Sequence, residues 1–261
     1  MKIEIFQVDA FTDKLFSGNP AAVCPLKDWL PDSTMQKIAS ENNLSETAFF
    51  IPEEDHYHIR WFTPATEVDL CGHATLATAH VIYCHLEQKK ANLIQFNSKS
   101  GLLFVRKNGE LITMNFPVAK LQKVEPPVEI VQAFRMKPIE TWKADDYLIL
   151  LDSQAAIQSA SPDFNLLCSL KSRGVIITAK GDSVDFVSRF FAPGVGIDED
   201  PVTGSAHTML TPFWAQRLGK NEMTAKQLSR RGGTLFCRLL NDRVDISGKA
   251  VTYMTGIISV D

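Results

Sequence analysis

The chain of 261 residues contains an internal repeat, and this repeat restricts the fold to two similar halves. Gly72 and Gly101 in the first half match Gly204 and Gly233 in the second, and both pairs are separated by 132 positions (204 − 72 and 233 − 101). The first glycine of each half opens an apolar segment of helical length, and the second precedes a strand-like run. The repeat therefore predicts an α+β fold in which each half wraps strands around a central helix.

The two copies differ in the length of one loop. The motif Arg-aromatic-Phe-x-Pro occupies residues 60–64 and recurs at 189–193, an offset of 129 (189 − 60), so the second copy has three more residues before its glycine. The extra residues fall around Gly194 to Asp200. A loop that is longer in one copy gives two similar halves different chemistry.

The repeat also predicts the domain organisation. We expect residues 1–118 to form the N-terminal half and residues 119–261 the C-terminal half, with the terminal strand free to cross over. Each half is large enough to bury a core without metal or disulfide support. The segment 117–138, which contains a Pro126-Pro127 pair, is the expected link.

Local patterns place the main elements. Residues 74–86 are apolar around most of the circumference, so this helix must be enclosed. Its counterpart, residues 206–218, should end at Gly219, and Pro212 should kink it or leave its first turns loosely wound. The Ser-x-x-Gln pattern at residues 33–36 predicts a capping box and a helix that ends near Asn42-Asn43. A strand over residues 46–51 follows, with an acid at its entrance.

Composition excludes several classes of function. The net charge of −3 and the lack of a long Lys and Arg run argue against nucleic-acid binding. No apolar stretch is long enough to cross a membrane, and the five cysteines are scattered without paired spacing. We therefore expect a cytoplasmic protein.

Both predicted central helices begin with small residues. Gly72-His73-Ala74 and Gly204-Ser205-Ala206 leave backbone N–H groups accessible, and a helix N-terminus carries partial positive charge. If a pseudo-twofold axis relates the halves, both N-termini face one cleft, where a carboxylate substrate would bind.

Three residues near these helix starts could transfer or donate protons, although each also has an ordinary structural interpretation. Asp200 precedes the second helix start and could equally be an N-terminal cap. His73 could equally be a partly buried histidine with satisfied hydrogen bonds. Ser205, taken alone, is more often a capping hydroxyl.

Four motifs in the same order resemble the PhzF-like family, the phenazine-biosynthesis isomerases of the diaminopimelate-epimerase-like fold. The resemblance extends from residue 3 to about residue 250. The motifs are Phe16-Ser17-Gly18-Asn19-Pro20, Ser45-Glu46-Thr47-Ala48-Phe49, Phe62-Thr63-Pro64 with Glu67 to Thr75, and Asp200-Pro201-Val202-Thr203-Gly204-Ser205-Ala206.

The resemblance implies both fold and chemistry. Members have two similar halves, each a β-barrel-like sheet around a central helix, and isomerise a small substrate by moving a proton without metal or organic cofactor. The family's general acid/base corresponds to Glu46, and its other catalytic positions correspond to His73, Asp200 and Ser205. The chemistry agrees with this assignment, because a carboxyl group in a dry cleft can take a proton and return it at another carbon.

The resemblance also extends to residues that would bind the substrate and to assembly. We expect Asn19 and the backbone at the two helix starts to contact the substrate; the residues at these starts are Gly72, Ala74, Gly204 and Ala206. Members often pair, which favours a homodimer.

Cys71 is the position that keeps a second enzymatic interpretation open. The related epimerases use two opposed cysteines, and Cys71 resembles the first of them, but Val202 and Thr203 stand where the second is expected. Two-thiol racemisation is therefore disfavoured, and Cys71 is interpreted as a small packed residue or as the single thiol base of an epimerase. A third alternative is a non-catalytic protein that binds a small molecule.

Overall fold

The computed structural model describes residues 1–86 and 92–260. Two compact units are present: unit 1 contains Met1–Asn115 and Ser247–Asp261, and unit 2 contains Phe116–Ile246. The boundary predicted from the sequence lies between residues 118 and 119, with the terminal strand free to cross over. In the structure this last strand pairs along its length with the first strand of the chain.

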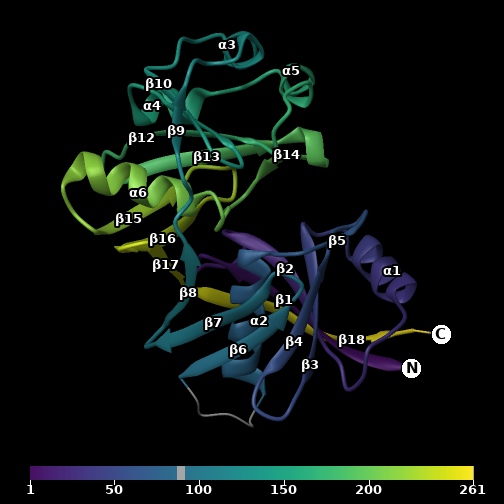
Figure 1. Cartoon of the computed structure of the whole chain (residues 1–261). Coiled ribbons are helices and arrows are strands. Elements are labelled where there is room, and N and C mark those ends of the chain that lie inside the picture. The colour runs from purple at the N-terminus through teal and green to yellow at the C-terminus, as the bar shows by residue number, and fades with distance from the viewer. Residues whose placement is uncertain (87–91, 261) are drawn as a thin grey trace. The chain divides into compact units, whose positions relative to one another are not determined.

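The described helices and strands alternate along the chain (Figure 1). The helices are α1 Asp32–Asn42, α2 Gly72–His85, α3 Val128–Phe134, α4 Gln154–Ser159, α5 Phe164–Cys168 and α6 His207–Leu218, with a 3-10 turn, η1, at Pro193–Val195. The strands of unit 1 are β1 Lys2–Ala10, β2 Asn19–Pro25, β3 Glu46–Pro52, β4 Tyr57–Phe62, β5 Glu67–Val68, β6 Leu93–Ser98, β7 Gly101–Asn108, β8 Leu111–Pro117 and β18 Ala250–Ser259. The remaining strands are β9 Gln122–Val124, β10 Glu140–Lys143, β11 Tyr147–Leu150, β12 Val175–Lys180, β13 Phe186–Ala192, β14 Ile197–Asp200, β15 Glu222–Gln227, β16 Gly233–Leu240 and β17 Arg243–Gly248.

The two copies of the sequence repeat have the same order of parallel and antiparallel strand pairings. In unit 1, β2 and β3 are parallel, β3 and β4 antiparallel, β4 and β6 parallel, and β6 and β7 antiparallel. In unit 2 the same four pairings join β11 to β12, β12 to β13, β13 to β15, and β15 to β16. The central helix precedes β6 in one unit and β15 in the other. Each unit therefore has the same α+β plan.

Helix α2 is the central helix of unit 1. Its residues from His73 to Ala79 are all buried, together with Val81 and Ile82. It contacts β1, β2, β3 and β18, and Figure 1 shows it surrounded by strands of this unit. Helix α1 packs on the opposite face of the sheet, where Met35, Ile38 and Ala39 join a cluster with Ile3 and Phe49. The sequence prediction of an enclosed helix is confirmed.

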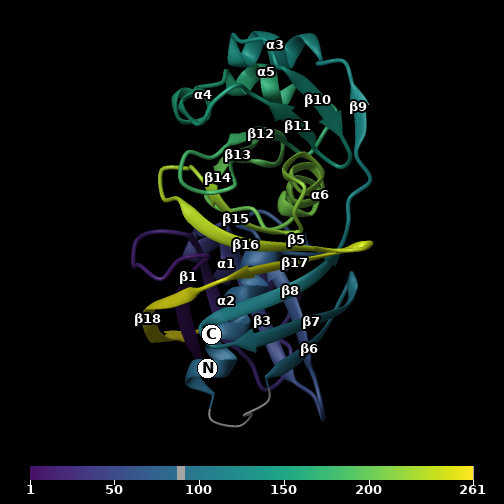
Figure 2. The same ribbon diagram turned by 90° about the vertical axis from the view of Figure 1, so that its left-hand side faces the viewer.

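Helix α6 occupies the corresponding place in unit 2 (Figure 2). The indole of Trp214 stacks on Phe186 and donates to the Thr178 hydroxyl over 2.9 Å. The opposite face of this sheet packs against the short helices α3, α4 and α5, and Ile177 and Phe191 lie in that second core. Two layers of apolar contacts thus sandwich the sheet of unit 2.

The repeated Arg-aromatic-Phe motif builds the same ion pair in both units. Arg60 binds Glu67 with two hydrogen bonds of 2.7 and 2.9 Å, and Arg189 binds Glu199 with two of 2.6 and 2.9 Å. Each guanidinium also lies over the ring of a phenylalanine two residues later. The bonds to Arg60 lower the pKa of Glu67 to about 2. The motif is therefore a structural clamp between a long strand and the short strand that follows it.

Three local predictions need correction. Helix α1 begins at Asp32 after Pro31, without a side-chain cap, so the predicted capping box at Ser33 is wrong. Helix α6 begins at His207. Before its regular turns, the backbone N–H groups of residues 207–209 donate to the carbonyl oxygens three positions earlier, at residues 204–206. This start is tightly wound, so the loose first turns predicted from Pro212 are not observed, and α6 continues through Pro212 to Leu218. The expected link at 117–138 contains β9 and α3.

The loop before β2 depends on a glycine. Gly18 has a φ of +67°, and a Cβ there would lie 2.2 Å from the Ala10 carbonyl oxygen. Gly18→Ala should lower the free energy of unfolding by about 3 kcal/mol. The matched control is Gly109→Ala, because Gly109 has a φ of +60° and nothing within 4 Å of the added atom, so about 1 kcal/mol is expected. Urea denaturation of both variants measures the difference, and equal losses would show that crowding at Gly18 is unimportant.

No helix in residues 1–86 or 92–260 is both long and apolar enough to cross a membrane. All five cysteines are free thiols. Cys24, Cys71 and Cys237 are buried, and burial raises the pKa of Cys24 and of Cys237 to about 12. Cys84 and Cys168 are exposed.

Candidate functional site

Glu46 is the first residue of β3. Helix α1 ends at Asn42, and the left-handed conformation of the next residue, Asn43, turns the chain toward the strand. Glu46 then pairs with Ala21 of the parallel strand β2. The side chain of Glu46 is 12% exposed. An acid at the entrance to an otherwise buried strand carries a desolvation cost, so its environment must supply polar partners.

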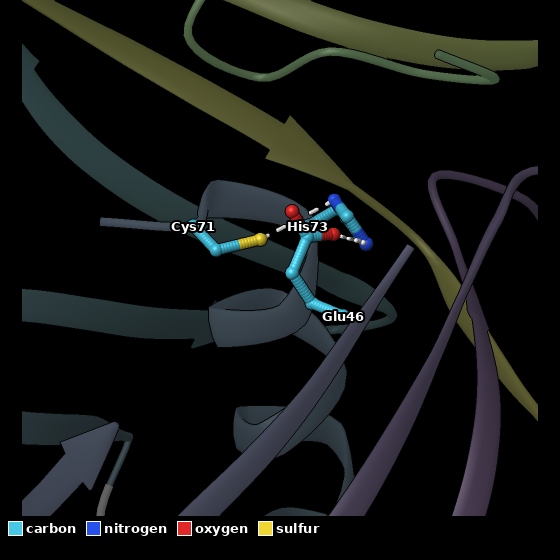
Figure 3. Close-up of side chains that lie close together, drawn as sticks. All are labelled: Glu46, Cys71 and His73. Carbon is cyan, nitrogen blue, oxygen red and sulfur yellow. Dashed lines mark hydrogen bonds and ion pairs between the residues drawn. The ribbon is translucent and has the colours of Figure 1, made fainter. Parts of the chain in front are cut away.

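His73 is such a partner. It is the second residue of α2, its side chain is 5% exposed, and its Nε2 lies 3.2 Å from Oε2 of Glu46 (Figure 3). Burial lowers the pKa of His73 to about 3, so the imidazole is neutral at physiological pH. The contact therefore joins a carboxyl group to a neutral imidazole and is not an ion pair between opposite charges.

Cys71 completes a row of three polar groups. It is the residue immediately before α2, it is buried, and its Sγ lies 3.5 Å from Nδ1 of His73 (Figure 3). The two imidazole nitrogens thus face two different side chains, Cys71 on one side and Glu46 on the other. Glu46 and His73 were predicted site residues, but the sequence did not connect either of them to Cys71.

These three side chains also form the one group of potential metal ligands found in residues 1–86 and 92–260. One donor atom from each residue lies within 4.8 Å of the others. A single ion could bond only one of the two imidazole nitrogens, so it would break one of the two contacts that His73 makes.

The start of α2 is suited to bind an anion. The Cys71 side chain makes no capping hydrogen bond, and no acidic residue lies in the first turn. The backbone N–H groups around Gly72 and Ala74 therefore carry the partial positive charge of a helix start that neither the N-cap side chain nor an acidic residue of the first turn neutralises. Asn19, fully buried, begins β2 two residues before Ala21, the partner of Glu46 in the sheet.

Asp200 lies at the end of β14 in unit 2. Its carboxylate accepts a 2.6 Å hydrogen bond from the Thr203 hydroxyl, and Gln227 connects the two residues by donating to the Asp200 carbonyl oxygen. Gln227 also accepts from the Thr203 N–H over 2.9 Å. Asp200 is not the N-cap of α6, because Ala206 occupies that position.

Ser205 lies in the turn before α6, between Gly204 and Ala206. Its Oγ accepts a 3.1 Å hydrogen bond from Arg173, which also binds the buried Asp146 through two nitrogens. Burial by itself would lower the pKa of Arg173, but the bond to Asp146 and the charges of Asp145, Asp146 and Asp200 raise it. Sequence reasoning missed Arg173 and Asp146, since no motif includes them.

The predicted site residues therefore fall into two polar clusters. The cluster of unit 1 contains Glu46 and His73, with Cys71 added by the structure. The cluster of unit 2 contains Asp200 and, through Arg173, Ser205.

The buried histidines predict how stability changes with pH. Burial lowers the pKa of His73 to about 3, and that of His207 to about 4 despite a hydrogen bond to the Thr203 carbonyl. The unfolded chain takes up protons on both residues near pH 6.5, and the folded chain does not, so stability should fall as the pH drops below about 6.5. Between pH 7.5 and 5 the loss should be about 2 kcal/mol per histidine. Urea midpoints at both pH values test this, and His73→Gln should show a smaller loss than the original protein; an unchanged loss would contradict the assignment.

The comparisons with known proteins give one consistent result. A family model described as phenazine biosynthesis-like protein, PhzC-PhzF, matches residues 8–256. The chain is 50% identical over 258 residues to a Pseudomonas aeruginosa protein named an uncharacterized isomerase, and the match covers 99% of each chain. It is 41% identical to a mouse phenazine biosynthesis-like domain-containing protein, with 99% of this chain and all of the mouse protein covered. The crystal structure of a PhzF family protein from Enterococcus faecalis has a TM-score of 0.97 and 44% identity, with both chains fully covered.

Proposed function

Because this chain belongs to the PhzC-PhzF family of phenazine biosynthesis-like proteins, we propose that it is an isomerase that moves a proton on a small carboxylate substrate without a cofactor. The isomerase names of relatives at 50% identity support the class of reaction. The observation that carries the mechanism is the Glu46 carboxyl group beside a neutral His73 at the uncapped start of α2.

Glu46 is the group that takes and returns the proton in this proposal. Its small exposed fraction keeps bulk water away, and a carboxyl group has one oxygen for His73 and a second for the substrate. As the substrate loses its proton, negative charge develops on it. The N–H groups at the start of α2 then stabilise that charge more strongly than they stabilise the neutral ground state.

His73 positions Glu46 and remains neutral during the reaction. Burial lowers the pKa of His73 to about 3, so its imidazole is a weak base, and the proton that Glu46 removes stays on the carboxyl group in this proposal. We also propose that Asp200 and Ser205 bind and polarise the substrate. The hydrogen bond that Ser205 accepts from Arg173 leaves the Ser205 hydroxyl proton available for donation.

The second candidate is an epimerase in which Cys71 is the base. The 3.5 Å contact between its thiol and His73 favours this alternative, because a neighbouring imidazole can accept the thiol proton. Loss of all activity in a folded Cys71→Ala variant would support the thiol base, whereas substantial remaining activity supports Glu46.

The proposed reaction can be tested before the substrate is known. The protein is treated with a chelator and incubated in heavy water with a panel of small cyclic and amino-acid-derived carboxylates, and mass spectrometry detects deuterium incorporated at carbon. We expect exchange on at least one compound, and no exchange on it with Glu46→Gln. Exchange that the chelator abolishes would contradict cofactor independence, and a substrate whose exchange survives in Glu46→Gln would contradict the role of Glu46.

A further inference from the structure

The Cys71 thiol belongs to the same polar row as the proposed acid/base but has no role in the mechanism above. Its Sγ is 3.5 Å from Nδ1 of His73, and Nε2 of the same ring is 3.2 Å from Oε2 of Glu46 (Figure 3). The donor atoms of these three residues are gathered within 4.8 Å. A thiol and a carboxyl group are thus joined by an imidazole that touches one with each nitrogen.

A neutral imidazole in this position can carry only one proton. With the proton on Nε2, the ring carries its hydrogen on the nitrogen that lies 3.2 Å from Oε2 of Glu46, and Nδ1 accepts from the Cys71 thiol; with the proton on Nδ1, the ring donates to sulfur and Nε2 is free to accept from a protonated Glu46. The Nε2–Oε2 approach is close but is not aligned as a hydrogen bond in the structure, so the ring must turn for the proton to pass between these two atoms. The two tautomers correspond to two distributions of the same protons over the three side chains. In the first, the negative charge is on Glu46, and in the second it is on the sulfur.

We propose that Cys71 is a proton-relay residue that shares one proton with Glu46 through His73. In the transfer the Sγ–H bond breaks as an Nδ1–H bond forms, and the Nε2–H bond breaks as an O–H bond forms on Oε2 of Glu46. No proton enters or leaves, and the negative charge moves from the carboxylate to the thiolate. The relay therefore converts Glu46 from a base into an acid without a proton from solvent.

The position of Cys71 stabilises the charge at the far end of this relay. Cys71 is the residue before the first turn of α2, a helix of 14 residues, and thiolates are stabilised at helix N-termini. Cys24 and Cys237, which are buried elsewhere, have pKa values raised to about 12 and lie outside the His73 contact. Cys71 thus combines an imidazole neighbour with a helix start.

The role of the relay in catalysis rests on the proposed function. The proton sharing itself can be tested without a substrate. The measurement is the rate at which a small alkylating reagent modifies Cys71 at pH 7, followed by peptide mass spectrometry. The exposed Cys168 in the same sample is the reference for reagent and pH. The original protein is compared with Glu46→Gln and with His73→Asn.

The relay and a purely electrostatic effect of Glu46 predict opposite changes in the alkylation rate of Cys71. If the relay operates, Glu46→Gln removes the acceptor of the thiol proton, so alkylation of Cys71 relative to Cys168 should slow at least about fivefold. If Glu46 affects Cys71 only because its negative charge repels the thiolate, removing that charge favours the thiolate, and alkylation of Cys71 should become faster. His73→Asn, which keeps the carboxylate, should also slow it. An unchanged or faster rate in both folded variants would overturn the relay.

Activity provides a separate readout. Cys71→Ala should keep the exchange reaction but lower its rate about tenfold and shift one limb of the kcat/KM pH profile. Cys71→Ser should resemble Cys71→Ala, because a hydroxyl is a much weaker acid than a thiol. A pH profile that neither variant shifts would overturn the relay while leaving Glu46 as the acid/base. The absence of any exchange in the original protein would instead argue against the proposed function, and the alkylation result would still stand.

Discussion

Replacing Glu46 by Gln should lower kcat for proton transfer by about 10³-fold, because an amide cannot accept a proton from carbon. Glu46→Asp should retain part of the activity and lose about 10²-fold, since the shorter side chain withdraws the carboxylate from both His73 and the substrate. Steady-state kinetics of the exchanged compound measures both effects. The ratio of the kcat values of the two variants separates the effect of losing the carboxylate from the effect of moving it.

Folding must be controlled in this comparison. Glu46 begins β3, and its backbone pairs with Ala21 whichever side chain is present, so Gln should leave the strand intact. The circular dichroism spectrum of Glu46→Gln should match that of the original protein. Its free energy of unfolding, measured by urea denaturation, should agree within about 1 kcal/mol. A folded Glu46→Gln variant with near-normal kcat would remove Glu46 from the mechanism.

Arg189→Met should destabilise unit 2 by about 3 to 4 kcal/mol. The guanidinium binds Glu199 with two nitrogens and donates to the carbonyl oxygens of Ile157 and Ala160 at the end of α4. Removing it leaves a partly buried carboxylate and two carbonyl groups without these donors. Urea denaturation followed by the fluorescence of Trp142 and Trp214, which lie in this unit, should show the loss.

The repeat supplies a matched control for that experiment. Arg60→Met removes the equivalent ion pair in unit 1, but Glu67 keeps a 2.6 Å contact with Lys99, and the other partner of Arg60 is the exposed Asp32. A smaller loss of about 1 to 2 kcal/mol is therefore expected. Equal losses from the two variants would show that the carbonyl contacts of Arg189 contribute little.

The sequence was sufficient to predict the elements that depend on local pattern. The apolar circumference of residues 74–86 predicted the enclosed helix α2, and the largely apolar run 46–51 predicted β3 with Glu46 at its start. The family and its α+β fold were predicted from four motifs and are confirmed by the comparisons. The constant offset of 132 positions between the copies reflects a shared order of strand pairing.

Other features depend on contacts between distant residues or on a balance that local rules do not decide. The pairing of Arg173 with Asp146 and Ser205 joins positions 27 and 32 residues apart, and no periodicity signals it. The capping box failed because the N-cap of α1 is Pro31, two residues before Ser33. The contact between Cys71 and His73 was available from their spacing, because a residue at a helix start lies close to the second residue of the first turn. Its significance required knowing that Glu46 lies on the other side of the ring.

The most direct test of the account follows the transferred hydrogen itself. A substrate carrying deuterium on the carbon that loses the proton is converted in ordinary water under single-turnover conditions, and mass spectrometry locates the label in the product. If one sheltered carboxyl group takes the proton and returns it, a measurable fraction of the product will carry deuterium at the carbon that gains the proton. Product without any label at that carbon would contradict a single shuttling group.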